Sequence, residues 1–189
     1  MNILVVVDAQ KGFVQTPHME NVANSIEVIL QKGLFDYVIA TRFINVEGSQ
    51  FMRLMNWYGL TTDTEQELFG NIATLCNKVL GKNVYTCVDA IFLRLLEKEN
   101  GGKLPDHVFI CGFDTDCCVQ KIAVDIFEQG IRPIVLIDYC QSSGGEKSHN
   151  AGVAVLKRLV GETSIVSQAI EDQSDITEAI LKANSIFNT

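Results

Sequence analysis

Three side chains of this sequence could together carry out nucleophilic chemistry: the thiol of Cys118, the carboxylate of Asp8 and the amine of Lys82. Cys118 follows a Gly-Phe-Asp-Thr-Asp-Cys turn and stands at the predicted start of a helix. We expect the N–H groups of a helix N-terminus to lower the pKa of this thiol and to bind an oxyanion formed when the thiolate attacks a carbonyl. Asp8 could take or return the thiol proton, and Lys82 could stabilise the charges of both groups.

Each of these residues also has a structural interpretation. An aspartate after a first strand often caps a loop or a helix, a lysine after a strand is usually solvated, and most cysteines are small buried apolar residues. The spacing along the chain does not show that the three side chains meet. From the residues alone, a catalytic triad and three unrelated structural roles therefore both stay open.

Short apolar segments alternate with amphipathic segments along the chain. Strands are predicted at residues 2–7, 37–41, 78–82, 107–111, 133–137 and 164–166, and helices at residues 22–32, 90–98, 118–129, 146–159 and 175–183. Such alternation is typical of an α/β fold, in which helices cover both faces of a parallel sheet. Ligands of these folds bind beyond the carboxyl ends of the strands, and Asp8, Lys82 and Cys118 all follow predicted strand ends.

Composition narrows the class of protein. A chain of 189 residues with 47% hydrophobic residues suits one domain, 1–189. The formal net charge of −8 gives no general attraction to nucleic acid or to an anionic membrane, so we expect neither as a partner. No targeting segment or membrane span is visible, which points to the cytoplasm. The six cysteines include no Cys-x-x-Cys pair, and His18, His107 and His149 are scattered, so neither disulfides nor a zinc cluster are expected.

Four motifs, in order along most of the chain, carry a family resemblance. Asp8-Ala-Gln-Lys-Gly-Phe13 resembles a D-x-Q-x-x-F motif after a first strand, and Lys82-Asn-Val-Tyr-Thr86 resembles K-x-x-Y-S. Gly112-Phe-Asp-Thr-Asp-Cys-Cys-Val119 resembles G-x-x-T-D-x-C-V, and Asp138-Tyr-Cys140 resembles a D-A-C turn after the next strand. Together they make the chain similar to the isochorismatase-like cysteine hydrolase superfamily, which includes nicotinamidases, N-carbamoylsarcosine amidases, and ureidoacrylate and biuret hydrolases.

The resemblance implies a fold, a reaction and residue roles. The fold would be a three-layer α/β/α arrangement around a six-stranded, mainly parallel sheet of order 3-2-1-4-5-6. The reaction would be hydrolysis of a C–N bond in a small amide, carbamoyl or ureido compound, with Cys118 as the nucleophile that forms a thioester, Asp8 as the general base and Lys82 as the supporting cation. A cis peptide bond between Phe113 and Asp114, backbone oxyanion donors at Asp114 and Cys118, and a homodimer or homotetramer are also implied.

Departures from the family pattern restrict the substrate. Metal-binding nicotinamidases carry D-x-H after the second strand, where this chain has Thr41-Arg-Phe-Ile-Asn45. We therefore expect no catalytic metal and no other cofactor, and nicotinamide becomes a less favoured substrate. Cys87 stands in place of the alanine of a family S-A-F segment, which brings a second thiol near the site. True isochorismatases lack the nucleophilic cysteine, so cleavage of isochorismate is disfavoured.

Substrate contacts are predicted for Gln10, Phe13, Arg42, Asn45 and Trp57. Arg42 suits bidentate binding of a carboxylate, with a surface ion pair as the alternative. Gln10 and Phe13 either line the pocket or have a structural role. Trp57 belongs to residues 51–60, a segment that suits either an aromatic pocket wall or a contact between subunits.

Two other functions stay open. Cys87, Cys117 and Cys118 together could form a thiol-redox centre that performs no hydrolysis. Alternatively, the chain could be a degenerate binding protein on the same fold, because a fold does not dictate a function. The presence of all three catalytic residue types favours the hydrolase of a small molecule.

Overall fold

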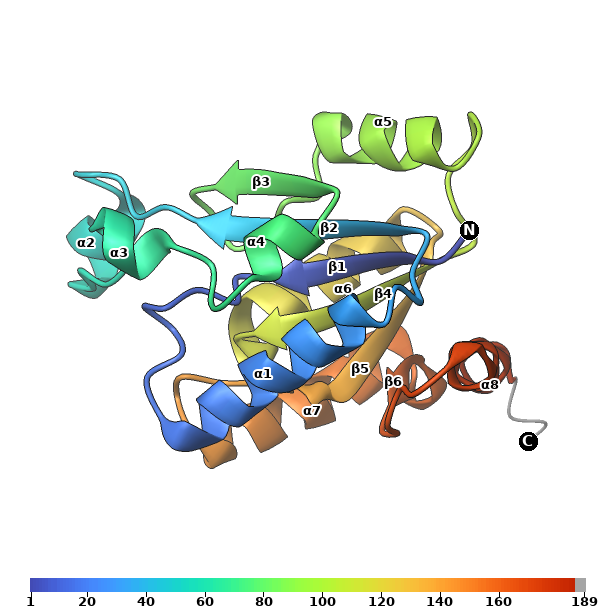
Figure 1. Ribbon diagram of the computed structural model, residues 1–189. Helices are drawn as coiled ribbons and strands as arrows, with labels where there is room; N and C mark the ends of the chain where they lie inside the picture. The colour runs from blue at the N-terminus through green and yellow to red at the C-terminus, as the bar shows by residue number, and fades with distance from the viewer. Residues whose placement is uncertain (186–189) are drawn as a thin grey trace.

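The computed structural model describes residues 1–185 and contains one six-stranded sheet of order β3-β2-β1-β4-β5-β6 (Figure 1). The strands are β1 (Ile3–Val7), β2 (Tyr37–Phe43), β3 (Lys78–Lys82), β4 (His107–Phe113), β5 (Arg132–Gln141) and β6 (Ile165–Val166). Every neighbouring pair is parallel. The predicted fold class and strand order are confirmed, and all carboxyl ends of the strands face the same edge of the sheet.

Helices cover both faces of this sheet. They are α1 (Pro17–Gln31), α2 (Gln50–Met55), α3 (Asp63–Gln66), α4 (Ile72–Leu75), α5 (Ala90–Glu99), α6 (Gln120–Glu128), α7 (Glu146–Val160) and α8 (Gln173–Asn184), with a π-helical turn η1 (Thr115–Val119) and a 3₁₀ turn η2 (Glu162–Ser164). Helices α1 and α4 pack together on one face, and α6 and α7 pack together on the other. Helices α2 and α3 lie beyond the carboxyl ends of the strands, which is where ligands of such sheets bind (Figure 1).

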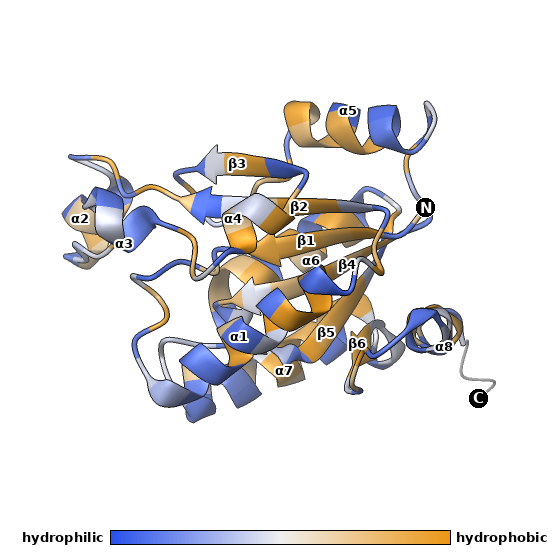
Figure 2. Ribbon diagram, viewed as in Figure 1, coloured by the Kyte–Doolittle hydropathy of each residue, from blue (hydrophilic) through white to orange (hydrophobic). Residues whose placement is uncertain are grey.

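Burial on both faces explains the composition of the central strands. All residues of β1 are fully buried, and β4 is nearly so, which suits their almost continuous apolar sequence (Figure 2). Helix α1 is amphipathic instead, because its buried residues recur every three or four positions. Its start is marked by Thr16, whose hydroxyl accepts a hydrogen bond from the Met19 N–H, and by Pro17 in the first turn.

Strand β5 differs most from its prediction. It continues to Gln141, so residues 138–140 lie within the strand and do not form the turn expected from the resemblance. The register with β4 shifts between Ile110, which pairs with Val135, and Gly112, which pairs with Cys140. This irregularity adds residues to β5 without breaking the strand. The short helices α2, α3 and α4 were also not predicted, because four to six residues are too few to show helical periodicity.

Gly112 allows β4 to approach β1 closely at the edge where the site lies. Its φ is 117°, and a Cβ atom there would lie 2.1 Å from the carbonyl oxygen of Val7. Only glycine fits such a contact. The end of β1, followed at once by Asp8, is thereby held against the end of β4 and the turn that carries Cys118.

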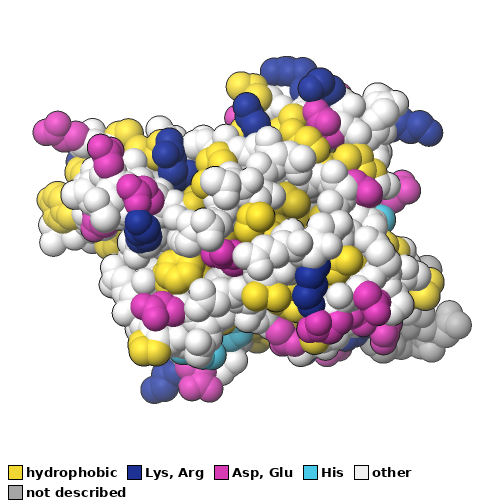
Figure 3. All heavy atoms as spheres, viewed as in Figure 1, with side chains coloured by type: hydrophobic (Ala, Val, Ile, Leu, Met, Phe, Trp, Pro, Cys, Tyr) yellow, Lys and Arg dark blue, Asp and Glu magenta, His cyan; other side chains and the backbone are white. Residues whose placement is uncertain are grey.

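The surface is mixed in charge. Figure 3 shows acidic and basic side chains interspersed with polar and apolar ones over one face of the molecule. None of the helices in residues 1–185 is long and apolar enough to cross a lipid bilayer.

Candidate functional site

Asp8 follows β1 with a fully buried side chain and an unusual backbone conformation. Its φ is +44°, a region that aspartate tolerates better than most residues but that still costs free energy. The hydroxyl of Thr41 in β2 donates a hydrogen bond of 2.7 Å to Asp8 Oδ1 and accepts one of 3.1 Å from the Asp8 N–H. One neighbouring side chain therefore fixes both the backbone and the carboxylate of Asp8.

Lys82 joins the three residues that were predicted to carry the chemistry. Its Nζ lies 2.6 Å from Asp8 Oδ2 and donates a hydrogen bond of 3.2 Å to Cys118 Sγ. A further hydrogen bond of 3.1 Å goes to the Val84 carbonyl, and the ammonium lies 5.1 Å from the centroid of the Phe43 ring. The structure thus brings the side chains of Asp8, Lys82 and Cys118 together in one buried cluster.

One oxygen of this cluster has no hydrogen bond. Among the buried side-chain oxygen and nitrogen atoms of residues 1–185, only Asp8 Oδ2 lacks a partner of acceptable geometry. The 2.6 Å separation from Lys82 Nζ is therefore an ionic contact whose direction is poor for a hydrogen bond. Oδ2 consequently keeps a lone pair that can accept a proton.

The ionisation of Cys118 differs from the sequence-based expectation. The side chain is 4% exposed, and burial together with the charge of Asp8 raises the pKa of its thiol well above 9, against the opposing effect of Lys82. The expected lowering by the helix terminus does not prevail, because the sulfur lies in the core beside a carboxylate. Burial lowers the pKa of Lys82, but Asp8 and Cys118 more than offset this and raise it. The resting cluster is therefore a thiol, an ammonium and a carboxylate.

The turn that carries Cys118 is held by the segment after β5 and by α7. The peptide bond between Phe113 and Asp114 is cis, as the resemblance implied. The Asp114 carboxylate accepts hydrogen bonds from the N–H and the hydroxyl of Ser143, at 2.7 Å and 2.5 Å.

The next two residues of the turn are tied in the same way. The hydroxyl of Ser142 donates a 2.6 Å hydrogen bond to the Asp116 carboxylate. The hydroxyl of Thr115 forms a 2.8 Å hydrogen bond with Nδ1 of His149. A Cβ atom on Gly152 of α7 would lie 2.8 Å from the Asp116 backbone, so α7 packs directly against the turn. Residues far along the chain therefore determine where the thiol lies.

The Asp114 carbonyl accepts hydrogen bonds from the N–H groups on either side of Cys118 in the sequence, those of Cys117 at 3.1 Å and Val119 at 3.0 Å. This turn has the π-helical form, and α6 continues from it. Cys118 therefore stands at the start of a longer helical segment, as its sequence position predicted.

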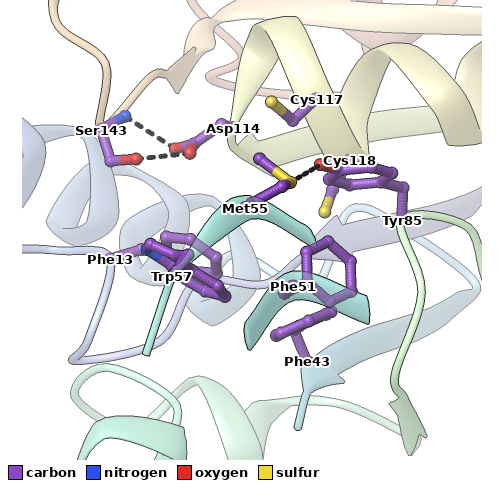
Figure 4. A pocket seen from close by; sticks show the side chains of 10 residues that line it. All are labelled: Phe13, Phe43, Phe51, Met55, Trp57, Tyr85, Asp114, Cys117, Cys118 and Ser143. Atoms are coloured by element: carbon purple, nitrogen blue, oxygen red, sulfur yellow. Dashed lines mark hydrogen bonds between the residues drawn. The ribbon is translucent and has the colours of Figure 1, made fainter. Parts of the chain in front are cut away.

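A pocket of about 160 Å³ lies next to Cys118 (Figure 4). It is lined by Phe13, Phe43, Phe51, Met55, Trp57, Tyr85, Asp114, Cys117, Cys118 and Ser143. The aromatic side chains gather on one side in Figure 4, and the hydrogen-bonded pair of Asp114 and Ser143 lies on another. The pocket is therefore mostly apolar, with one carboxylate on its wall and a thiol at its base.

The residues predicted to contact substrate divide into two groups. Phe13 and Trp57 line the pocket, with their rings nearly parallel and their centroids 6.4 Å apart. The side chains of Gln10, Arg42 and Asn45 do not line it.

Each of these three has another place in the structure. The amide of Gln10 exchanges hydrogen bonds with the Phe43 backbone, at 2.9 Å and 2.7 Å, and so joins the loop after β1 to β2. The amide of Asn45 donates to the Gly59 carbonyl at 2.9 Å, which closes the loop that holds Trp57. Arg42 is exposed, because side chains alternate along a strand and Thr41 and Phe43 take the buried side.

Several residues of the site were not found from the sequence. They are Thr41, Phe43, Tyr85, Ser143 and the side chain of Asp114, whereas Phe51 and Met55 belong to the segment 51–60 that was predicted as an aromatic pocket wall or a subunit contact. Thr41 and Phe43 could have been found by alternation, since they share one face at the end of a predicted strand. Nothing in the sequence pairs Ser143 with Asp114, 29 residues apart, because only the packing of β5 beside β4 brings them together.

The residues at the end of β2 and just after it do not fit a metal. Where metal-binding relatives were expected to carry acidic and imidazole ligands, this chain places the Phe43 ring and the Asn45 amide, which bonds backbone carbonyls. In residues 1–185 no three side chains of His, Cys, Asp or Glu are grouped so that they could hold a metal ion. We therefore derive no catalytic step through a metal.

The chain matches one protein family along most of its length. The family model described as the isochorismatase domain matches residues 2–168. No curated protein sequence matches the chain.

Solved structures share the fold. An isochorismatase-like hydrolase from Alkaliphilus metalliredigens has a TM-score of 0.75 at 17% identity and covers 95% of this chain and 98% of its own. A pyrazinamidase of Pyrococcus horikoshii in complex with zinc has a TM-score of 0.71 at 19% identity, covering 88% and 99%. A nicotinamidase from Bacillus subtilis has a TM-score of 0.67 at 18% identity, covering 89% and 100%.

Proposed function

Because the chain belongs to the isochorismatase family, we propose that it is a cysteine-dependent hydrolase of a C–N bond in a small amide, carbamoyl or ureido compound. The observation that carries this proposal is the position of Lys82 Nζ, 2.6 Å from Asp8 Oδ2 and 3.2 Å from Sγ of Cys118, which lines a mostly apolar pocket. A nucleophile and a base that both contact one cation suit acyl transfer through a thioester. Structural relatives named as amidases agree with the scissile bond.

The first half of the reaction begins from a protonated thiol. As Cys118 Sγ attacks the carbonyl carbon, its proton passes to Asp8 Oδ2, the oxygen without a hydrogen bond. The S–C bond forms and the carbonyl electron pair moves to oxygen, giving a tetrahedral oxyanion. In this proposal the backbone N–H groups of Asp114 and Cys118 stabilise that oxyanion. Lys82 balances the negative charge that moves between Asp8 and Cys118.

The following steps release the amine and then hydrolyse the thioester. The oxyanion collapses, the C–N bond breaks, and Asp8 gives the proton to the leaving nitrogen, so that ammonia or an amine departs and a thioester remains on Cys118. A water molecule then loses a proton to Asp8 while its oxygen attacks the thioester carbon. The S–C bond breaks, the proton returns to sulfur, and the acid leaves. One water is consumed for each C–N bond broken.

The alternative of a thiol-redox centre receives no support from the neighbouring cysteines. Burial raises the pKa of the Cys117 thiol to about 11 and that of the Cys87 thiol to about 12. Thiols with such pKa values are almost entirely protonated at neutral pH and attack disulfides slowly. A hydrolytic role uses only Cys118, which shares the contact of Lys82 with the proposed proton acceptor Asp8.

A screen for released ammonia over small amides, ureides and carbamoyl compounds tests the proposal. For any compound that the wild-type protein hydrolyses, we expect Cys118→Ala to lose at least about a thousandfold in kcat/KM, because no thioester can form. Cys117→Ala is the matched control, since it removes the adjacent thiol from the same pocket and should keep most of the activity. Undiminished turnover by Cys118→Ala would show that Cys118 is not the nucleophile.

A further inference from the structure

We propose that this pocket selects substrates with a positive charge: small amides or carbamoyl compounds that bear an ammonium or quaternary ammonium group, with Asp114 as the counter-charge and the aromatic rings as the cage. This inference rests on the proposed hydrolytic function and adds the class of substrate. It depends on the side chain of Asp114, to which the hydrolytic mechanism assigns no role, and on the aromatic wall opposite.

The carboxylate of Asp114 is a buried anion without a cation. The residue is 8% exposed and lines the pocket. The N–H and hydroxyl of Ser143 hold its two oxygens at 2.7 Å and 2.5 Å, which fixes its orientation (Figure 4). None of the ion pairs within the described residues involves Asp114. A carboxylate taken out of water with only neutral donors is costly unless a ligand supplies the missing charge.

The rest of the cluster leaves this charge uncompensated. The ammonium of Lys82 contacts the carboxylate of Asp8, so these two charges cancel. The thiol of Cys118 is neutral at rest, because burial raises its pKa. Burial also raises the pKa of Asp114 to about 6, with smaller contributions from the charges of Asp116 and Asp8 and against the hydrogen bonds of Ser143. At neutral pH most of the Asp114 carboxyl is therefore ionised, and the pocket carries one net negative charge.

The aromatic wall suits a cation as well as an apolar group. The Phe51 ring makes edge contacts with Phe43 and Tyr85, at centroid separations of 5.0 Å and 5.1 Å, and with Trp57 at 6.0 Å. Phe13 stacks against Trp57 beside them. The faces of such rings attract ammonium groups, and cages of this kind bind quaternary ammonium ligands. A neutral amide could use the same rings, but it would leave the Asp114 carboxylate without a charge partner.

The size of the pocket limits the ligand. A volume of about 160 Å³ is close to that of an engineered cavity of roughly 150 Å³ that accepts benzene. We therefore expect a substrate of about six to nine non-hydrogen atoms, with its carbonyl carbon at Cys118 and its cationic nitrogen at least two bonds from that carbon.

Two isosteric amides separate charge from shape. (Trimethylammonio)acetamide and 3,3-dimethylbutanamide differ in one atom, a cationic nitrogen in place of a neutral carbon. Malonamate is a smaller amide that carries a negative charge. We expect kcat/KM of the wild-type protein to favour the cation over its neutral isostere by about tenfold to a hundredfold, and malonamate to be the poorest substrate. Asp114→Asn should lower the preference for the cation at least about fivefold.

A binding measurement keeps the inference testable even if none of these amides is hydrolysed. Trp57 is the only tryptophan in the chain and lines the pocket, so its fluorescence reports occupancy. Titrating the Cys118→Ala protein with both isosteres measures charge preference without turnover. Asp116→Asn is the matched control, because its carboxylate lies in the same turn, bonds Ser142 and does not line the pocket. It should leave the preference unchanged.

The outcomes are distinct. A cation preference in binding that Asp114→Asn removes supports the charged-substrate inference whether or not hydrolysis is seen. Equal or tighter binding of the neutral isostere overturns it, and so does a preference that survives in Asp114→Asn. Absence of ammonia release from every amide tested would count against the hydrolase proposal and not against the charge preference.

Discussion

The hydroxyl of Thr41 bonds to both the backbone and the carboxylate of Asp8, at 3.1 Å from the Asp8 N–H and 2.7 Å from Oδ1. With Oδ1 held in this way, Oδ2 is turned toward Lys82. A residue of β2 that does not line the pocket therefore positions the proposed base.

Replacing Thr41 tests this positioning role. Thr41→Val keeps the shape of the side chain but removes both hydrogen bonds to Asp8. We expect kcat to fall by about tenfold to a hundredfold, because the Asp8 carboxylate is no longer held in one orientation. The dissociation constant of the substrate should change little, since Thr41 does not line the pocket. Thr41→Ser should restore most of kcat. A loss confined to thermal stability, or a loss that serine does not rescue, would indicate a structural role only.

Asp8 and Lys82 should affect the Cys118 thiol in opposite directions. The charge of Asp8 raises the pKa of this thiol and Lys82 lowers it. Asp8→Asn should therefore increase the rate at which iodoacetamide alkylates Cys118 at pH 8, by about threefold to fourfold for each unit by which the pKa falls, because the thiolate becomes about tenfold more abundant but also less nucleophilic. Lys82→Met should decrease this rate.

Both substitutions should nevertheless abolish hydrolysis, because one removes the proton acceptor and the other the balancing cation. Site-resolved mass spectrometry of the alkylated protein measures Cys118 separately from the other cysteines. Alkylation of Cys76, distant in sequence from the cluster, is the internal reference. If alkylation and hydrolysis rise or fall together in Asp8→Asn, the assignment of Asp8 as the base fails.

The buried carboxylate of Asp114 should cost stability at neutral pH. Its pKa rises from 3.8 to about 6 in the folded protein, so the folded state binds more protons than the unfolded state between these values. The free energy of unfolding should therefore fall as the pH rises through this window, by at most about 3 kcal/mol. We expect Asp114→Asn to be more stable than the wild type at pH 8, with a difference that shrinks toward pH 4.

Urea unfolding at several pH values measures this effect. Asp116→Asn controls for the loss of an acidic side chain from the same turn. A gain in stability combined with a loss of cation selectivity is the pattern of a residue kept for function at a cost in stability. If Asp114→Asn is destabilised equally at all pH values, the charge of Asp114 is not the source of the effect.

Local patterns in the sequence were sufficient for the central strands and the longer helices. Continuous apolar residues at β1 require burial on both faces, and this property does not depend on the rest of the chain. The boundary of β5 could not be predicted, because its continuation to Gln141 depends on a register shift against β4. The strand order came from the resemblance and not from the strands themselves, since pairing joins segments that are far apart.

Individual site residues show the same division. The sequence identified Cys118, Asp8 and Lys82 because each follows a strand and matches a motif, and such strand ends converge in a parallel sheet. It misjudged the ionisation of Cys118, which depends on burial beside Asp8. It also offered Gln10 and Asn45 as substrate contacts, whereas their amides hold the backbone of the loops around the pocket.

The class of fold, the family resemblance and the three side chains proposed to react could thus be read from the sequence, because local periodicity and short motifs carry them. Only folding brings Lys82 into contact with both Asp8 and Cys118, keeps the thiol protonated at rest, and places Asp114 and the aromatic rings in one pocket. These features depend on the distances between side chains, on their burial and on the charges around them, and side chains far apart in the sequence come together only when the chain folds.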